Sequence, residues 1–244
     1  MPHEVAGNKL MVLLAFGGLV SGLLTSVLMA PGQQEAGLYC GAVFGSFLAV
    51  PLVISRILDA GILYSFLKAL GLIVVSTAAY LFAYLTAFGV QLNFPQIVPN
   101  AERWDMGTAE PASPIALFVG GLVGGFLVFG AVMFFSPPEI GKGTRVRKVI
   151  QGALLGGVLG VAAWALRSSV GVALWNLFHA FGLTPRWELS PRMWFHGVYD
   201  YGGTARMYSL YVVWQTGVAT AVGIMLRHTP VRGEYESNDL RLKF

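Results

Sequence analysis

Long apolar stretches separated by short polar connections run along the whole chain. Each is close to the roughly 20 residues that a helix needs to cross a hydrocarbon core about 30 Å thick. Their apolar residues run continuously rather than alternating as in barrel strands, which favours helices. Six stretches fit this description: residues 10–30, 37–55, 66–89, 114–136, 149–178 and 207–226, with ends uncertain by several residues. The pattern predicts an all-α integral membrane protein in which residues 1–244 form one bundle of about six transmembrane helices.

Composition supports a membrane environment. Of the 244 residues, 55% are hydrophobic and only 11% are charged, and the mean hydropathy is +0.66. Ordinary soluble domains have about 25% charged residues. A chain so poor in charge cannot cover itself with polar surface, and no separate soluble domain is expected.

The lysines and arginines of the connections predict the orientation. Residues 137–148 and the tail 227–244 each contain four cations, and Arg56 and Lys68 flank the second connection. Cytoplasmic loops carry an excess of Lys and Arg, so we expect these segments and both termini in the cytoplasm, in a cytoplasmic-type (inner) membrane. The outer loops then comprise residues 90–113 and 181–206, although Arg186, Arg192 and Arg206 weaken this bias in the second loop.

Glycine spacing predicts how the helices pack. The chain has 31 glycines, and many recur at four-residue intervals, as in Gly18/Gly22, Gly41/Gly45, Gly120/Gly124 and Gly152/Gly156. Such GxxxG spacing clears one helix face for close backbone approach. We expect tight Gly-mediated packing within the bundle, with a face for another subunit as the alternative.

Two local similarities suggest a weak internal repeat. AFG recurs at 87–89 and 180–182, and residues 41–50 are similar to 120–129, which suggests a helical hairpin repeated in one orientation. Residues 17–24 are also similar to 120–127, which instead suggests two inverted three-helix halves, as in many secondary transporters. The two matches are mutually exclusive, and with so many glycines we favour chance similarity as the explanation of each.

The acidic residues lie in the segments outside the apolar stretches. All 12 acidic residues lie there, which argues against a proton-coupled transporter because such proteins use intramembrane acids or histidines. Cys40 is the only cysteine, so neither an internal disulfide nor a multi-cysteine metal site can form. The net charge of +4 follows from the basic loops, and no nucleic-acid partner is expected. The cofactor is unknown; no covalent or metal site is evident, and lipid contacts are expected.

Arg167, Ser168 and Ser169 interrupt the fifth apolar stretch and form the candidate buried contact. If that helix enters the membrane near Val149, Arg167 lies about 27 Å further along and can extend to the outer headgroups. If the helix enters later, the arginine lies deeper and needs a carboxylate, a phosphate or backbone carbonyls as partner. The two serines can satisfy helix carbonyls in either case.

A candidate outer-face cluster surrounds the last outer loop: His179, Trp187, Trp194, His196 and Asp200. His196 with Asp200 could serve general acid/base chemistry, but the spacing matches no nucleophile or metal motif. The alternative, which we favour, is an aromatic belt at the membrane interface.

Three functions are compatible with these features. We expect a noncatalytic membrane subunit that anchors or scaffolds a larger membrane protein assembly, with lipids and either partner subunits or further copies of the chain as partners. The first alternative is a small permease or channel for an anionic or lipid-like solute. The second is a membrane enzyme that acts on a lipid-linked substrate through the residues named above.

Overall fold

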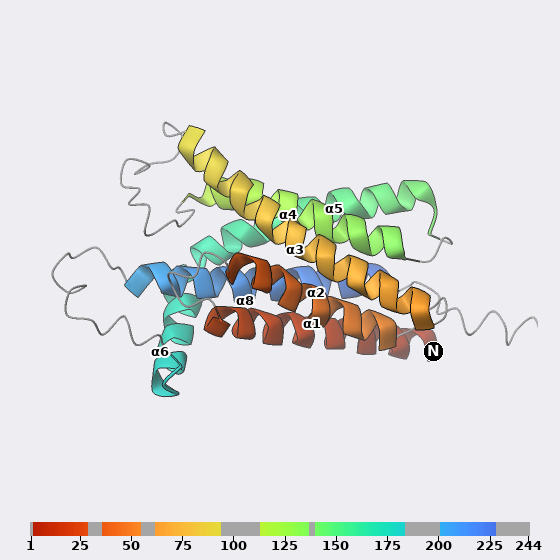
Figure 1. The fold of residues 1–244 in the computed structure, drawn as a ribbon, viewed down its shortest axis with the longest axis horizontal. Coiled ribbons are helices and arrows are strands. Elements are labelled where there is room, and N and C mark those ends of the chain that lie inside the picture. The colour runs from red at the N-terminus through yellow and green to blue at the C-terminus, as the bar shows by residue number, and fades with distance from the viewer. Residues whose placement is uncertain are drawn as a thin grey trace, which may run out of the picture.

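The computed structural model describes residues 2–28, 36–54, 62–93, 113–136, 140–183 and 201–227, and these segments consist of helices and their flanking turns. The elements are α1 (Pro2–Leu28), α2 (Ala36–Ile54), α3 (Ile62–Asn93), α4 (Pro114–Phe135), α5 (Lys142–Ala165), the π-helical turn η2 (Arg167–Gly171), α6 (Val172–Ala180) and α8 (Tyr201–Leu226) (Figure 1). No strand occurs in these ranges, and the all-α prediction is confirmed for them.

Five helices are long and apolar enough to cross a membrane, judged by length and composition: Gly7–Leu28, Leu63–Val90, Pro114–Phe135, Lys142–Ala165 and Ser209–Leu226. The apolar part of α2, Tyr39–Ile54, is a shorter apolar helix. The described residues are thus compatible with an integral membrane protein. The sixth crossing stays a prediction.

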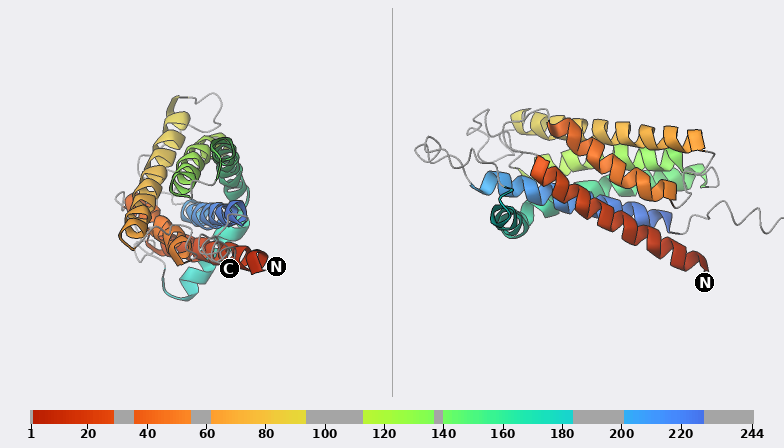
Figure 2. Two further views of the ribbon diagram at one scale, coloured as in Figure 1. Left: turned by 90° about the vertical axis from the view of Figure 1, so that its right-hand side faces the viewer. Right: turned by 60° about the horizontal axis from the view of Figure 1, so that its bottom comes forward.

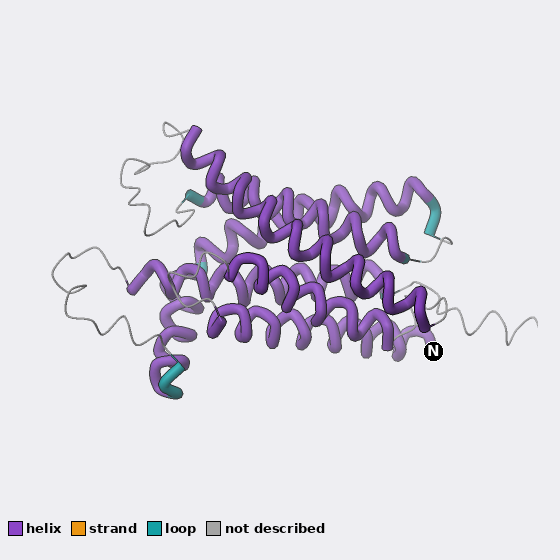
Figure 3. The backbone as a smooth tube through the Cα atoms, in the orientation of Figure 1, coloured by secondary structure: helices purple, strands orange, loops and turns teal. Residues whose placement is uncertain are grey.

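The prediction of one continuous helix over 149–178 is wrong. The helix begins earlier, at Lys142, and ends at Ala165, after which η2 redirects the chain into α6. α6 runs across the direction of the long helices (Figures 1 and 3). The backbone N–H groups of Ser169 and Val170 both donate to the carbonyl of Leu166, at 3.1 and 2.9 Å. The residues on both sides of the break are mostly apolar. The hydropathy pattern therefore does not reveal the break, which depends on backbone hydrogen bonding.

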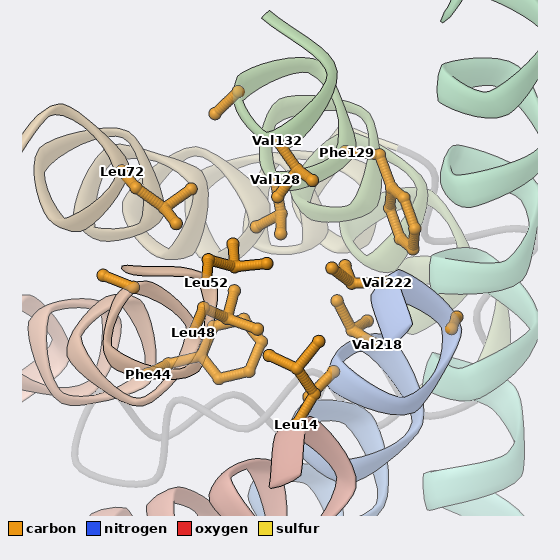
Figure 4. Packing of buried hydrophobic residues seen from close by; sticks show 14 of the residues in the cluster. Leu14, Phe44, Leu48, Leu52, Leu72, Val128, Phe129, Val132, Val218 and Val222 are labelled. Carbon is orange, nitrogen blue, oxygen red and sulfur yellow. The ribbon is translucent and has the colours of Figure 1, made fainter. Parts of the chain in front are cut away.

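The long helices form a closed arrangement around an apolar interior. Each of α1, α2, α3, α4, α5 and α8 packs against the next, and α8 packs back against α1; Figure 2 shows this arrangement along the bundle. Side chains from α1, α2, α3, α4 and α8 meet in the interior, among them Leu14, Phe44, Leu48, Leu52, Leu72, Val128, Val132, Val218 and Val222 (Figure 4). This closed ring of helices therefore encloses packed apolar side chains.

Glycines lie at close approaches between neighbouring helices. A Cβ atom on Gly121 of α4 would overlap the carbonyl of Gly156 in α5, and one on Gly156 would overlap the Gly121 carbonyl. Between α1 and α8, a Cβ on Gly22 would lie 2.7 Å from the Cα of Val212. The backbones are in contact at these points, so a side chain larger than hydrogen would force the helices apart.

Candidate functional site

The predicted buried contact falls on the break between α5 and α6. Arg167 is the first residue of η2 and Ser168 the second, and the side chains of both lie outside the described part of the structure. Ser169 is exposed, and its Oγ donates to the carbonyl of Leu166 at 3.1 Å. The Ser169 hydroxyl therefore bonds to a carbonyl of its own turn rather than to a neighbouring helix.

The predicted outer-face cluster is described at one position only. His179 lies in the last turn of α6 and its side chain is exposed. Trp187, Trp194, His196 and Asp200 lie outside the described residues. That these five side chains form one cluster stays a prediction.

A buried polar cluster between α1 and α8 is the clearest concentration of hydrogen bonding inside the bundle. Gln215 of α8 is fully buried, as are Ser21 and Thr25 of α1. The Oγ of Ser21 donates to Oε1 of Gln215 at 2.7 Å, and Nε2 of Gln215 donates to Oγ1 of Thr25 at 3.3 Å. The amide is thus held at both ends by hydroxyls one helical turn apart.

Trp214, the residue before Gln215, connects α8 to three other helices. Its indole N–H donates to the carbonyl of Gly156 in α5 at 3.2 Å. Its ring lies 5.7 Å from the ring of Phe44 in α2, measured between centroids. In α4, a Cβ on Gly124 would lie 3.1 Å from the same indole. The glycine at position 124 leaves space that this large side chain occupies.

Further polar groups lie nearby on α8 and α3. The Oγ of Ser209 donates to the carbonyl of Ala163 at 2.9 Å, two residues before α5 ends. The rings of Tyr211 and Tyr80 lie 5.8 Å apart. The Oγ of Ser76 in α3 is buried and has no hydrogen-bond partner among the described residues.

The chemistry of this cluster is that of neutral hydrogen bonding. An amide, hydroxyls and an indole exchange hydrogen bonds without a charge change near pH 7. Within the described residues, no group of three or more His, Cys, Asp or Glu side chains is placed to hold a metal ion. The arrangement ties α8 to α1 and α5, and this is the role that its geometry supports.

Sequence reasoning missed this cluster as a site. In the sequence, Trp214 and Gln215 are an aromatic and a polar residue within the sixth apolar stretch. The available signal is a glutamine inside an apolar stretch, since a buried amide must find partners. Ser21 and Thr25, four residues apart, lie on one face of a helix, but nothing in the sequence states that this face meets Gln215.

Comparison with known proteins found no family model, no curated protein and no solved structure that matches the chain.

Proposed function

We propose that the protein is a noncatalytic integral membrane subunit that anchors or scaffolds a larger membrane protein assembly. The observation that carries this proposal is the packed interior. Apolar side chains from five helices fill the ring, and the buried amide and indole bond to neighbouring helices. Such an interior favours a rigid structural element over a solute path.

The outward surface supplies the contact area for partners. α3 stands out, because only 17% of its most apolar window is buried, against 44% in α1 and 56% in α4. Its exposed side chains include Phe66, Val74, Phe82 and Leu85. We propose that this face of α3 packs against another subunit in the membrane.

The orientation is part of the same proposal. The bundle end where α1 begins and α8 ends is called here the basic end. The helix segments at this end contain Lys9, Lys68, Lys142, Arg145, Arg147, Lys148 and Arg227, whereas Arg167 and Arg206 lie in η2 and near the start of α8. Cytoplasmic flanks are enriched in Lys and Arg. We therefore propose six crossings with both termini in the cytoplasm, and close packing of the glycine faces within the bundle.

The test is purification in mild detergent followed by native mass measurement. We expect the protein to retain partner subunits. Val74→Trp on α3 should release them, whereas Val12→Trp on α1 should not; the two valines are 59% and 60% exposed, which makes the second a matched control. A monomer or a symmetric homo-oligomer with nothing bound would contradict the scaffold.

A permease for an anionic or lipid-like solute is the second candidate, and one observation favours it. The chain leaves α5 through a π turn that begins at Arg167, and π-helical turns occur frequently at functional sites. Interrupted helices form substrate sites in many transporters. In proteoliposomes, uptake of an organic anion that is lost in Arg167→Gln would support this role against the scaffold.

A further inference from the structure

The start of α5 concentrates positive charge at the basic end. Residues 137–148 contain four cations and one acid, Glu139, so their formal charge is 4 − 1 = +3. Two of the cations are engaged by backbone. Arg145 donates from Nε to the carbonyl of Ile140 at 2.9 Å and from Nη2 to that of Ser136 at 3.2 Å. Lys148 donates to the carbonyl of Met225, in the last turn of α8, at 2.6 Å.

The other two cations, Lys142 and Arg147, are exposed. Arg147 lies directly before a row of exposed apolar side chains on the same helix, formed by Ile150, Leu154 and Val158. Their spacing of three, four and four residues keeps the four side chains on one side of α5. A positive group thus lies at the end of the apolar row that is nearer the basic end.

Electrostatics at this point favours a bound anion. The start of a helix has a partial positive charge, and cations there are disfavoured unless an anion balances them. Within the first turn of α5 no acidic side chain is present, and the N-cap Gly141 offers no side-chain hydrogen bond. Space is open around Gly141 and Gly143, where an added Cβ would meet nothing within 4 Å.

We propose that α5 binds an anionic phospholipid, with its phosphate at Lys142 and Arg147 and its acyl chains along Ile150, Leu154 and Val158. Charge alone would suit a free phosphate equally well, but the apolar row below Arg147 matches a lipid. This inference rests on the orientation given under the proposed function, with the basic end at the headgroups. It does not depend on the scaffold role.

The test compares lipids that differ only in the headgroup. The full chain in detergent is titrated with phosphatidylglycerol or phosphatidylcholine of the same acyl chains, and bound lipid is counted by native mass measurement. We expect tighter binding of phosphatidylglycerol, reduced about fivefold for each cation removed in K142Q/R147Q. Arg147→Lys should retain most of the preference, since it retains the charge.

The control is R241Q/K243Q, which removes the same charge from the tail and should leave binding unchanged. Both replaced α5 side chains are exposed, so thermal unfolding of K142Q/R147Q should match that of the unaltered protein. Equal binding of the two lipids, an unchanged preference in K142Q/R147Q or displacement of the lipid by inorganic phosphate would each overturn the proposal. None of these results bears on partner subunits, so failure here is distinguishable from failure of the scaffold.

Discussion

Gln215 shows how one polar residue can matter in an apolar bundle. Its amide is removed from both water and lipid, and it is tolerated because hydroxyls of α1 hold its oxygen and its nitrogen. A buried amide without partners costs several times what a typical hydrogen bond contributes. The sequence predicts that such a residue needs partners, but Ser21 is 194 positions away, and no local pattern identifies it.

At this scale we predict that Gln215→Ala lowers the free energy of unfolding by about 1–3 kcal/mol, because two interhelical hydrogen bonds are lost and a cavity forms. Denaturant titration in detergent measures the change. Gln151→Ala is the matched control, since Gln151 is exposed on α5 and its replacement should change stability by less than about 0.5 kcal/mol. Equal effects of the two substitutions would refute a structural role for the buried amide.

The pairing of α4 with α5 illustrates the element scale. GxxxG spacing on both helices predicts close packing faces, and this role of the spacing stays a prediction. Gly121 and Gly156 lie against each other's backbone. The spacing cannot state which helix meets which, because α4 presents Gly120 to α3 and Gly121 to α5. The break after Ala165 was also missed, since a π turn changes hydrogen bonding without changing hydropathy.

We expect Gly121→Ala to push α4 away from α5, since its methyl group would meet the carbonyl of Gly156. The expected loss of stability is about 1–3 kcal/mol, as for other overpacked sites. Gly130→Ala, in the same helix, adds a methyl group that meets nothing within 4 Å. It should be neutral or stabilise the helix by up to about 1 kcal/mol. Thermal unfolding of both variants in one detergent decides whether contact or helix propensity dominates.

At the scale of the whole molecule, the ends of the bundle differ in charge. The described part of α5 begins with four cations in seven residues, Lys142 to Lys148, and α8 ends beside Arg227. The contact between Lys148 and Met225 joins the two segments. The proposed orientation places this end at the cytoplasmic headgroups, where anionic lipids favour positive charge.

Cysteine labelling tests this orientation. Cys40 is the only cysteine in the chain and is buried, so the folded protein should react little with a membrane-impermeant maleimide. In a Cys40→Ala background, Thr144→Cys at the exposed start of α5 should react in inside-out vesicles and stay unlabelled in intact spheroplasts. Labelling from the outer side would reverse the topology and remove the basis of the lipid site.

The sequence by itself determined the helical class of the structure and indicates an apolar environment, because helices satisfy the backbone of long apolar stretches that carry few charges. Only the tertiary structure decided which faces meet, that Gln215 and Trp214 hold α8 to α1 and α5, and that the fifth helix ends before Arg167. The physical reason is one of range. Hydropathy is a local sum over neighbouring residues, whereas hydrogen bonds and backbone contacts between helices depend on residues tens to hundreds of positions apart.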